Sequence, residues 1–367
     1  MNKSAAIKIY VALFLLIIPG FLSVFFPELS GDSQTEIRTL QDFPKLPNTL
    51  RDAYKWPRRF DQFASDRFPF RSGIIRFAGK TCYKMGFSIS PEILIGNDGW
   101  LFLLKNCEVL RRHQGIVQLS TTEIKDWVEA YIKRKDEIET NGAKLYFIIV
   151  PDKHTIYKNQ IPNHFSIVGK TITDQLVHAL VKQQVTQVID LRPVLQKSAF
   201  PRHIYDKYDS HWNDIGAYTG YKEIMDRIDP LQDIPRVTSN DISFKKVMKS
   251  GGLAWMIGNT SLYESTFEAE IFNSTILHRQ NYENKKKYET EEWISISSHK
   301  NSPVVICLCD SFVNNYLYKY LEQSFSKTIF KHHRSMTYDK QLIEKYHPEI
   351  VMYIVAERLI PFKLDND

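Results

Sequence analysis

The stretch VVICLCDSFVNNYLYKYLEQSFSKTIFKHH, residues 304–333, contains the pattern that decides the fold. It begins with a near-continuous apolar run, which is typical of a strand buried on both faces. Helix and strand patterns then alternate towards the end of the chain, at 312–323, 327–333, 338–347 and 349–355. Strand–helix units that repeat in this way predict an α/β fold with a mostly parallel sheet and helices on both faces.

The same alternation occupies the middle of the chain. Ser120 and Glu123 have the spacing of a capping box, and a helical face of apolar residues follows them. Further elements are expected as a strand at 143–151, a helix near 172–184, a strand at 187–190 and a helix after Asn213. The GNDG sequence between two apolar runs at 92–104 predicts a β-hairpin. Residues 230–300 lack clear periodicity and are expected to form a long insertion.

The bulk composition sets broad limits on function. With 43% hydrophobic and 25% charged residues, the 367-residue chain resembles ordinary globular proteins. Its 48 basic and 42 acidic side chains leave a mild net charge of +6, and the dense basic run at 285–287 is expected to be a solvated loop. Attraction to an acidic polymer is the lesser alternative, and no nucleic-acid partner is expected.

The N-terminus predicts a membrane anchor. Lys3 and Lys8 precede or border an uncharged, mainly apolar run from Ile9 to Phe26, whose 18 residues are near the minimum for a spanning helix. Bulky residues follow, so an uncleaved signal anchor is favoured over a removed signal peptide. The two lysines should stay cytoplasmic, which leaves the remaining chain outside the cytoplasm. The expected organisation is an anchor at 1–30, a membrane-proximal linker and helix at 31–80, and the main domain at 81–367.

The chain has four cysteines. An oxidising compartment would permit a Cys82–Cys107 bridge, which the sequence alone does not establish. Cys307 and Cys309 alternate on a predicted strand and should face the same side of it. Since C-x-C alone is not a zinc signature, two buried, inert thiols are the favoured state.

Ser311 is the candidate nucleophile. It follows the predicted strand at 304–309 and precedes a helix, and sites in such sheets lie at the carboxyl ends of strands. Backbone N–H groups at a helix N-terminus can stabilise an oxyanion, and the Ser311 N–H is the candidate donor by position. The alternative is that Asp310 or Ser311 only caps the helix.

The stretch YDSHWNDIGAY, residues 208–218, supplies the partners that such a serine needs. If it is extended, Asp209 and His211 project to the same face, so the carboxylate could orient the imidazole and the imidazole could deprotonate Ser311. A zinc site is a weaker interpretation, because D-x-H gives only two ligands and no further His cluster occurs. The remaining alternative is a polar cap with Asn213 at the helix start.

Several short motifs, taken together and in this order, resemble the AlgX/AlgJ group of extracytoplasmic polysaccharide O-acetyltransferases, which have an SGNH-hydrolase-like domain. The motifs are EIRTLQDFPKLP (36–47), DRFPFR (66–71), IGNDGWLF (95–102), VPDKHTIY (150–157), YDSHWNDIGAY (208–218), CDSF (309–312) and YHPEIVMYIVAERLI (346–360). The resemblance implies an SGNH-hydrolase-like catalytic domain over 81–367 and a catalytic triad of Asp209, His211 and Ser311. Their order along the chain differs from that of ordinary SGNH hydrolases, but a triad is defined by geometry and not by order.

Two positions depart from the group's pattern. Cys309 stands where the group usually has a glycine, which brings the shape of the turn before Ser311 into question. Gly251-Gly252-Leu253 stands where the group often has Gly-Asp-Leu, so a carboxylate is lost there. Neither change removes a member of the triad.

The resemblance implies acetyl transfer to hydroxyls of an exported, alginate-type polysaccharide through an acyl-Ser311 intermediate. It also implies a membrane-bound O-acyltransferase that supplies the acetyl group, an inner-membrane location with the catalytic domain facing the periplasm or cell exterior, and no metal or other cofactor. A carbohydrate acetylesterase with the same triad and a non-catalytic scaffold of a polysaccharide export complex are the alternatives. Trp212 is the best single candidate for sugar contact by position, and packing beneath the triad is at least as well supported.

Overall fold

A computed structural model of the chain describes residues 7, 8, 10, 41–66, 68, 70–105, 108–199, 201–228, 233–282, 292–333, 336 and 339–364. The chain divides into two compact units, one comprising 1–95 with 250–263 and the other comprising 96–249 with 264–367. Apart from Ile7, Lys8 and Tyr10, the expected anchor at 1–30 lies outside the described residues. Within the described ranges, no helix has both the length and the apolar character needed to cross a bilayer.

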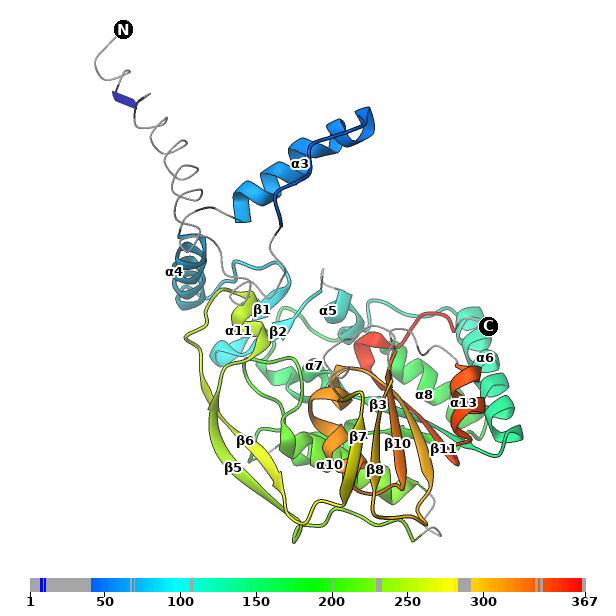
Figure 1. Ribbon diagram of the computed structural model, residues 1–367. Coiled ribbons are helices and arrows are strands. Elements are labelled where there is room, and N and C mark those ends of the chain that lie inside the picture. Colours follow the sequence, from blue (N-terminus) through cyan, green and yellow to red (C-terminus); the bar gives the residue numbers. More distant parts are fainter. Residues whose placement is uncertain are drawn as a thin grey trace. The chain divides into compact units, whose positions relative to one another are not determined.

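The larger unit is built around a mixed sheet (Figure 1). Seven strands of the described residues follow the order β4-β3-β11-β9-β10-β8-β7. Their bounds are β3 (Lys144–Val150), β4 (Val188–Asp190), β7 (Ile276–Gln280), β8 (Trp293–Ser297), β9 (Val304–Cys309), β10 (Lys327–His332) and β11 (Ile350–Ala356). The first five strands in that order pair in parallel, and β8 and β7 add an antiparallel edge. The strands predicted from the apolar runs are all present.

The stretch 230–300, expected to be an insertion, contributes part of this sheet. Its last two strands, β7 and β8, form the antiparallel edge. β5 (Ile242–Lys249) and β6 (Glu264–Ile271) form a separate antiparallel ribbon. The sequences of β5, β6 and β7 show no clear hydrophobic periodicity. β7 is mostly exposed, and buried and exposed residues alternate irregularly along β5 and β6.

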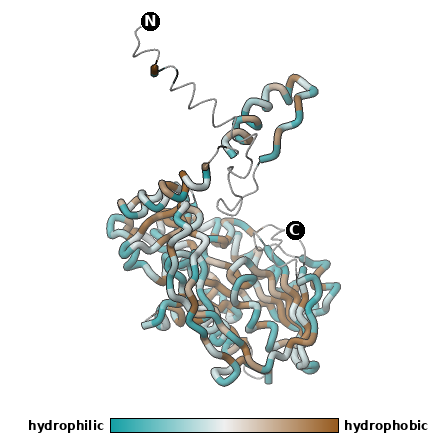
Figure 2. The backbone as a smooth tube through the Cα atoms, turned by 60° about the vertical axis from the view of Figure 1, so that its left-hand side comes forward, coloured by the Kyte–Doolittle hydropathy of each residue, from teal (hydrophilic) through white to brown (hydrophobic). Residues whose placement is uncertain are grey.

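Helices cover both faces of the sheet. On one face, α6 (Thr121–Thr140), α8 (Ile172–Lys182) and α13 (Lys340–Tyr346) bury apolar side chains against alternate residues of β3, β9 and β11. The opposite face carries α10 (Asp214–Arg227), which packs against α9 (Arg192–Ser198), the π-helical turn η5 (Val313–Leu317) and α12 (Tyr318–Leu321). In Figure 2, brown hydrophobic segments lie side by side in the lower right of the view, and β3, β9 and β11 are buried along nearly all of their length. This arrangement is the predicted α/β fold.

Short elements complete the larger unit. They are η2 (Asn97–Gly99), β2 (Leu101–Leu103), α5 (Glu108–His113), α7 (Lys153–Ile156), η3 (Lys158–Gln160) and η6 (Glu357–Leu359). The turn predicted at GNDG is present: the Gly96 N–H donates to the Trp100 carbonyl at 2.7 Å, and Asp98 adopts a left-handed φ of 54°. The capping box predicted for α6 is also present, since Ser120 and Glu123 bond each other's backbone N–H groups.

The smaller unit contains α3 (Leu50–Asp66), α4 (Arg71–Lys84), β1 (Ile93–Ile95) and α11 (Gly252–Met256). α4 approaches the end of α11 closely, because a Cβ on Gly79 would lie 2.1 Å from the Ile257 carbonyl oxygen. Gly251 and Gly252 begin α11, so the departure from Gly-Asp-Leu lies in this unit. Cys107 lies outside the described residues, so the bridge between Cys82 and Cys107 stays a prediction.

Candidate active site

Ser311 lies at the carboxyl end of a central strand. β9 ends at Cys309, and the helix that includes η5 begins directly after Asp310. The Asp310 side chain caps this turn, because its Oδ1 accepts from the Phe312 N–H at 2.9 Å. Its Oδ2 accepts from the Ala356 N–H at 2.8 Å, which ties the turn to the end of β11. Asp310 therefore does the capping, and the hydroxyl of Ser311 is left for another partner.

Asp209 and His211 reach the site from a short loop before α10. An isolated antiparallel β-bridge between Tyr205 and Trp212 joins the two ends of this loop. Asn213 caps α10, because its side chain accepts from the N–H groups of Ile215 and Gly216. The Asp209 Oδ1 also accepts from the backbone N–H of His211 at 3.0 Å. These contacts hold the backbone that carries His211 and so set the direction of its imidazole.

The structure brings the three predicted residues into one hydrogen-bonded chain. The Nδ1 of His211 lies 2.7 Å from Asp209 Oδ1, and its Nε2 lies 2.8 Å from Ser311 Oγ. With Nδ1–H donated to the carboxylate, Nε2 can accept from the serine hydroxyl. The side chains of Asp209 and His211 are 17% and 18% exposed, and Ser311 is half-buried. A substrate can therefore reach Ser311, while the carboxylate of Asp209 stays largely shielded from water.

An aromatic ring packs against the imidazole of His211. The ring of Phe312 lies edge-on to His211, with centroids 4.9 Å apart. Arg358 is on η6, and its guanidinium lies 5.0 Å from the centroid of the Phe312 ring. The guanidinium also pairs with Asp152, the N-cap residue of α7. Both Phe312 and Arg358 are largely buried, so this packing limits rotation of the imidazole.

Trp212 is fully buried. Its Nε1–H donates to the Phe312 carbonyl at 3.1 Å, and its ring packs against α10 at Gly216 and Gly220. Both glycines leave room for that side chain, since a Cβ on either would lie 3.0 Å from it. The structure therefore favours the packing role over sugar contact for Trp212.

Cys309 does not occupy a strained position. It is the last residue of β9, and it pairs in register with His332 of β10 and Ile354 of β11. Its thiol lies 3.7 Å from Asn314 Oδ1, and burial raises the pKa of the thiol well above its usual value. Extended backbone does not require glycine, so the turn forms without one. Cys307 and Cys309 are both fully buried, as expected for inert thiols.

Sequence patterns missed two charged residues that hold the loop carrying Asp209. The carboxylate of Glu264 on β6 accepts from the N–H groups of Lys207 and Tyr208 at 2.8 and 2.9 Å. The ammonium of Lys153, the first residue of α7, contacts the carbonyl groups of the same loop. The only signal for Lys153 was a polar residue just beyond a buried strand, in VPDKHTIY. Glu264 gave no signal, because its partners are backbone groups.

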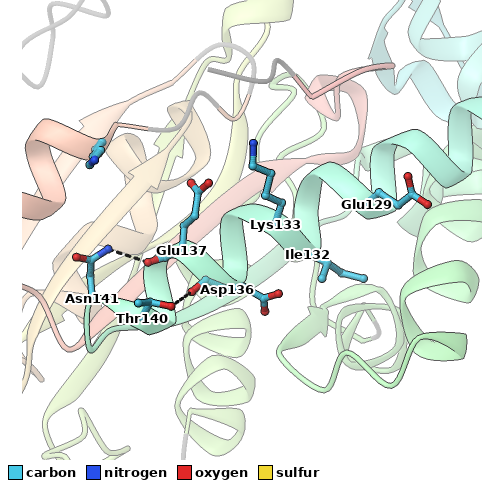
Figure 3. Close-up of a pocket in the computed structure, with 8 residues that line it drawn as sticks. Glu129, Ile132, Lys133, Asp136, Glu137, Thr140 and Asn141 are labelled. Atoms are coloured by element: carbon cyan, nitrogen blue, oxygen red, sulfur yellow. Dashed lines mark hydrogen bonds between the residues drawn. The ribbon is translucent and has the colours of Figure 1, made fainter.

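Two hollows of the larger unit differ in their relation to this site. The first hollow has a volume of about 850 Å³ and lies along the outer polar face of α6, with Lys340 among its lining residues. Figure 3 shows the acidic and basic side chains that line it, together with two hydrogen bonds, from Thr140 to Asp136 and from Asn141 to Glu137. None of its lining residues belongs to the Asp209–His211–Ser311 chain. The other, of about 490 Å³, is lined by Asp214, Lys249, Glu268, Ala269, Asn315, Tyr316 and Lys319. Asn315 and Tyr316 follow Ser311 by one helical turn, so this second hollow adjoins the nucleophile's helix.

No cluster of three or more potential metal ligands occurs in the part of the chain that the structure describes. The described arrangement offers instead a candidate nucleophile, a candidate base and a candidate orienting carboxylate in hydrogen-bond contact. Such a set performs acyl transfer on serine and needs no metal ligand.

Comparisons with known proteins identify the family of the chain. The family model of the SGNH hydrolase-like domain, acetyltransferase AlgX, matches residues 93–335. The chain is 22% identical over 224 residues to the probable alginate O-acetylase AlgJ of Pseudomonas syringae pv. tomato, a match that covers 61% of this chain and 52% of that protein. The chain thus spans about half the length of this curated relative.

Solved structures show the same fold. PatB1 of Bacillus cereus matches with a TM-score of 0.53 and 18% identity, over 74% of this chain and 99% of that chain. A second PatB1 structure, with a sulfonyl adduct, matches with a TM-score of 0.52 and 16% identity, over 75% and 97% of the two chains. Since the family model extends over most of the larger unit and more than half of the sequence, the chain belongs to the family of SGNH hydrolase-like domains of the AlgX acetyltransferase type.

Proposed function

We propose that this protein is an extracytoplasmic O-acetyltransferase that acetylates hydroxyls of an exported polysaccharide through an acetyl-Ser311 intermediate. The observation that carries the proposal is the continuous chain from Asp209 through His211 to Ser311, with contacts of 2.7 and 2.8 Å. Membership of the AlgX family and the similarity to an alginate O-acetylase support the choice of acetyl and polysaccharide as substrates.

In the first half-reaction, His211 Nε2 takes the proton of Ser311 Oγ as the oxygen attacks the carbonyl carbon of an acetyl ester. Asp209 stabilises the imidazolium that forms, because its Oδ1 accepts from Nδ1. The Ser311 N–H lies in the first turn of its helix, where N–H groups lack an intrahelical acceptor, and is the candidate donor to the oxyanion. The imidazolium then gives its proton to the leaving alcohol, and acetyl-Ser311 remains.

In the second half-reaction, a sugar hydroxyl replaces the alcohol. His211 removes its proton as the oxygen attacks the acetyl carbonyl, and the ester bond to Ser311 breaks with return of the proton to Oγ. The polar hollow at Asn315 and Tyr316 adjoins the nucleophile's helix and offers several hydrogen-bonding groups. We assign the acceptor sugar to this side of Ser311.

The proposal includes a cellular setting. The apolar run at 9–26 would hold the enzyme at the inner membrane with its catalytic domain outside the cytoplasm. A membrane-bound O-acyltransferase would supply the acetyl group there. Protease accessibility of the larger unit in spheroplasts tests this orientation: digestion supports it, and protection until the membrane is opened contradicts it.

The reaction itself is tested by acetyl transfer. The full chain in detergent is incubated with an activated aryl acetate, with and without an acceptor polysaccharide, and acetyl on the glycan is measured by mass spectrometry. Acetylated glycan that appears with the parent and is absent with Ser311→Ala supports transfer. Release of acetate at the same rate with and without glycan, and no acetylated glycan, would show a carbohydrate acetylesterase with the same catalytic residues.

A further inference from the structure

Lys153 makes an unusual set of contacts. It is 2% exposed, and its Nζ lies within hydrogen-bond distance of four backbone carbonyl oxygens. The four are those of Leu101 at 2.7 Å, Asp206 at 2.8 Å, Lys207 at 2.8 Å and Asp209 at 2.9 Å. Three of them belong to the loop that ends in the Asp209–His211 pair. One buried side chain therefore donates hydrogen bonds to several carbonyl groups of that loop.

The contacts suit an ammonium and not a neutral amine. An ammonium has three N–H donors and no acceptor, so it fits a site whose neighbours are all acceptors. The rings of Trp100 and Phe102 lie 5.0 and 5.2 Å from Nζ, within the range in which an aromatic face attracts a cation. A neutral amine has only two N–H donors, so it would bond fewer of these four carbonyl oxygens than the ammonium does.

The loop is held on its other side by an acidic group. Glu264 accepts from the N–H groups of Lys207 and Tyr208, while Lys153 donates to carbonyls at 206, 207 and 209. The backbone is thus fixed by a cation on its carbonyl side and an anion on its amide side. Because Asp209 is the last residue so held, its carboxylate is placed relative to His211 by these contacts.

We propose that Lys153 is a positioning residue for catalysis: its ammonium holds the 206–209 loop so that Asp209 keeps the His211 imidazole in reach of Ser311 Oγ. The proposal rests on the proposed function, since it assumes that this hydrogen-bonded chain performs the chemistry. Lys153 itself touches no reacting atom. Its effect should appear in the turnover step and in the state of the imidazole, with little effect on substrate binding.

The charge on Lys153 is sensitive to pH near neutrality. Burial lowers the pKa of Lys153 to about 7, against the attraction of Glu264 and of Asp209. The remaining charged or titratable groups that face it are Asp206, Lys207, His154 and His203. Burial also lowers the pKa of both histidines, so they stay neutral at pH 7 and above and do not replace the lost charge. The loop should loosen as the ammonium deprotonates, and turnover should fall on the alkaline side.

The pH dependence of turnover and that of the free energy of unfolding have opposite signs if Lys153 positions the catalytic loop. A lysine whose folded pKa lies below its unfolded value of 10.5 destabilises the folded state while it is charged, so the free energy of unfolding rises as pH rises from about 7 towards 10.5. Turnover is predicted to fall as pH rises through about 7. A purely structural role would give no such opposition between activity and stability.

The experiment compares Lys153→Met, Lys153→Arg and a control, Lys158→Met, in the full chain. Lys158 is exposed and lies five positions along the same segment. With an activated aryl acetate as substrate, Lys153→Met is expected to lose about 10- to 100-fold in kcat with KM changed less than about 3-fold, since general base catalysis contributes 10²–10⁴-fold. Lys158→Met should match the parent. Lys153→Arg keeps its charge at all these pH values and should partly restore kcat and remove the alkaline decline.

A spectroscopic measurement makes the test independent of folding of the variants. In the parent labelled with ¹⁵N-histidine, the low-field Nδ1–H proton of His211, assigned by its absence in His211→Gln, should weaken together with kcat between pH 6 and 9. If Lys153→Met folds and has the parent's kcat and His211 signal, the inference is wrong. If that variant does not fold, an unchanged signal and kcat in the parent across this pH range overturn the inference instead.

The two proposals fail differently. Equal acetate release by Ser311→Ala and the parent would remove the proposed function and this inference with it. Loss of activity in Ser311→Ala, combined with parent-like kinetics in a folded Lys153→Met, would remove only the role of Lys153.

Discussion

At the scale of single residues, the proposed chemistry depends on the carboxylate of Asp209. Its Oδ1 accepts from both the backbone N–H and the Nδ1 of His211, so one atom fixes the residue's position and its tautomer. Asp209→Asn keeps the size of the side chain but removes the charge that stabilises imidazolium. We expect kcat for acetyl-ester cleavage to fall by about 10²–10⁴-fold with little change in the urea midpoint. A loss below about 5-fold in a folded variant would show that Asp209 does not assist the imidazole.

Cys309 gives a second prediction at this scale. Its backbone is extended and its thiol is buried, so glycine there offers no relief of strain and leaves a void. Cys309→Gly should lower the free energy of unfolding by roughly 1–2 kcal/mol, from lost packing and added chain entropy. Its kcat should stay within about 3-fold of the parent. If turnover instead rises by about tenfold or more, the cysteine constrains the turn before Ser311.

The sequence revealed these residues unequally. The contact between Asp209, His211 and Ser311 could be predicted, because their residue types, spacing and place beside a strand or helix end carry the signal. Lys153 and Glu264 could not, because they act on backbone carbonyl and N–H groups that every residue possesses. Trp212 was ambiguous because an aromatic residue beside a triad serves sugar contact and packing equally well, and only its burial distinguishes the two.

At the scale of elements, α10 connects the site to the core. Asn213, two residues after His211, caps this helix by accepting from the N–H groups of Ile215 and Gly216, and its Nδ2 donates to the His203 carbonyl at 2.8 Å. The loop of the catalytic pair is therefore anchored at the point where the helix begins. Ser120 caps α6 in the same way, but on the face of the sheet opposite to α10.

The two caps make a matched pair of variants. Asn213→Ala and Ser120→Ala should each lower the free energy of unfolding by about 0.5–2 kcal/mol, measured by urea denaturation. Only Asn213→Ala should also lower kcat, by several-fold, because its loss releases the chain next to His211. Equal kcat in the two variants would mean that the cap of α10 does not support the site.

Elements could be predicted where periodicity is strong and not where it is weak. The buried parallel strands appear as apolar runs, and each was predicted within one or two residues. β7 and β8 were taken as part of an insertion, because neither carries a continuous apolar run. The edge strand β7 is mostly exposed, and the buried β8 alternates apolar residues with serines. The π-helical turn η5 was predicted only as part of a helix, since side-chain periodicity does not reveal a one-residue expansion of the backbone.

At the scale of the whole molecule, a buried ionic network should govern stability against pH. Glu357, after β11, accepts from the Asp152 N–H at 2.8 Å and from Thr155 Oγ1 at 2.5 Å, and it lies 3.7 Å from Arg192. Burial raises the pKa of Glu357 to about 7 from its usual 4.5, in spite of the attraction of Arg192. The folded state therefore binds a proton at pH values where the unfolded state does not.

This network gives a signed prediction. The stabilisation due to protonated Glu357 is fully present below pH 4.5 and is lost as pH rises through about 7. It should amount to roughly 3 kcal/mol for such a shift. Glu357→Gln, which cannot titrate, should remove this part of the decline in urea-unfolding free energy between pH 4.5 and 7. Parallel pH profiles for the parent and the variant would contradict the assignment.

The central claim is that Ser311 carries the acetyl group during the reaction. The most direct test is to mix the full chain with an activated aryl acetate, quench within one turnover, digest the protein and measure the peptide containing Ser311 by mass spectrometry. The account predicts one added acetyl group on Ser311 in the parent, a slower appearance of it in His211→Ala, and its absence in Ser311→Ala. Turnover of the ester without any acetyl on Ser311, or with acetyl on another residue that is needed for turnover, would contradict it.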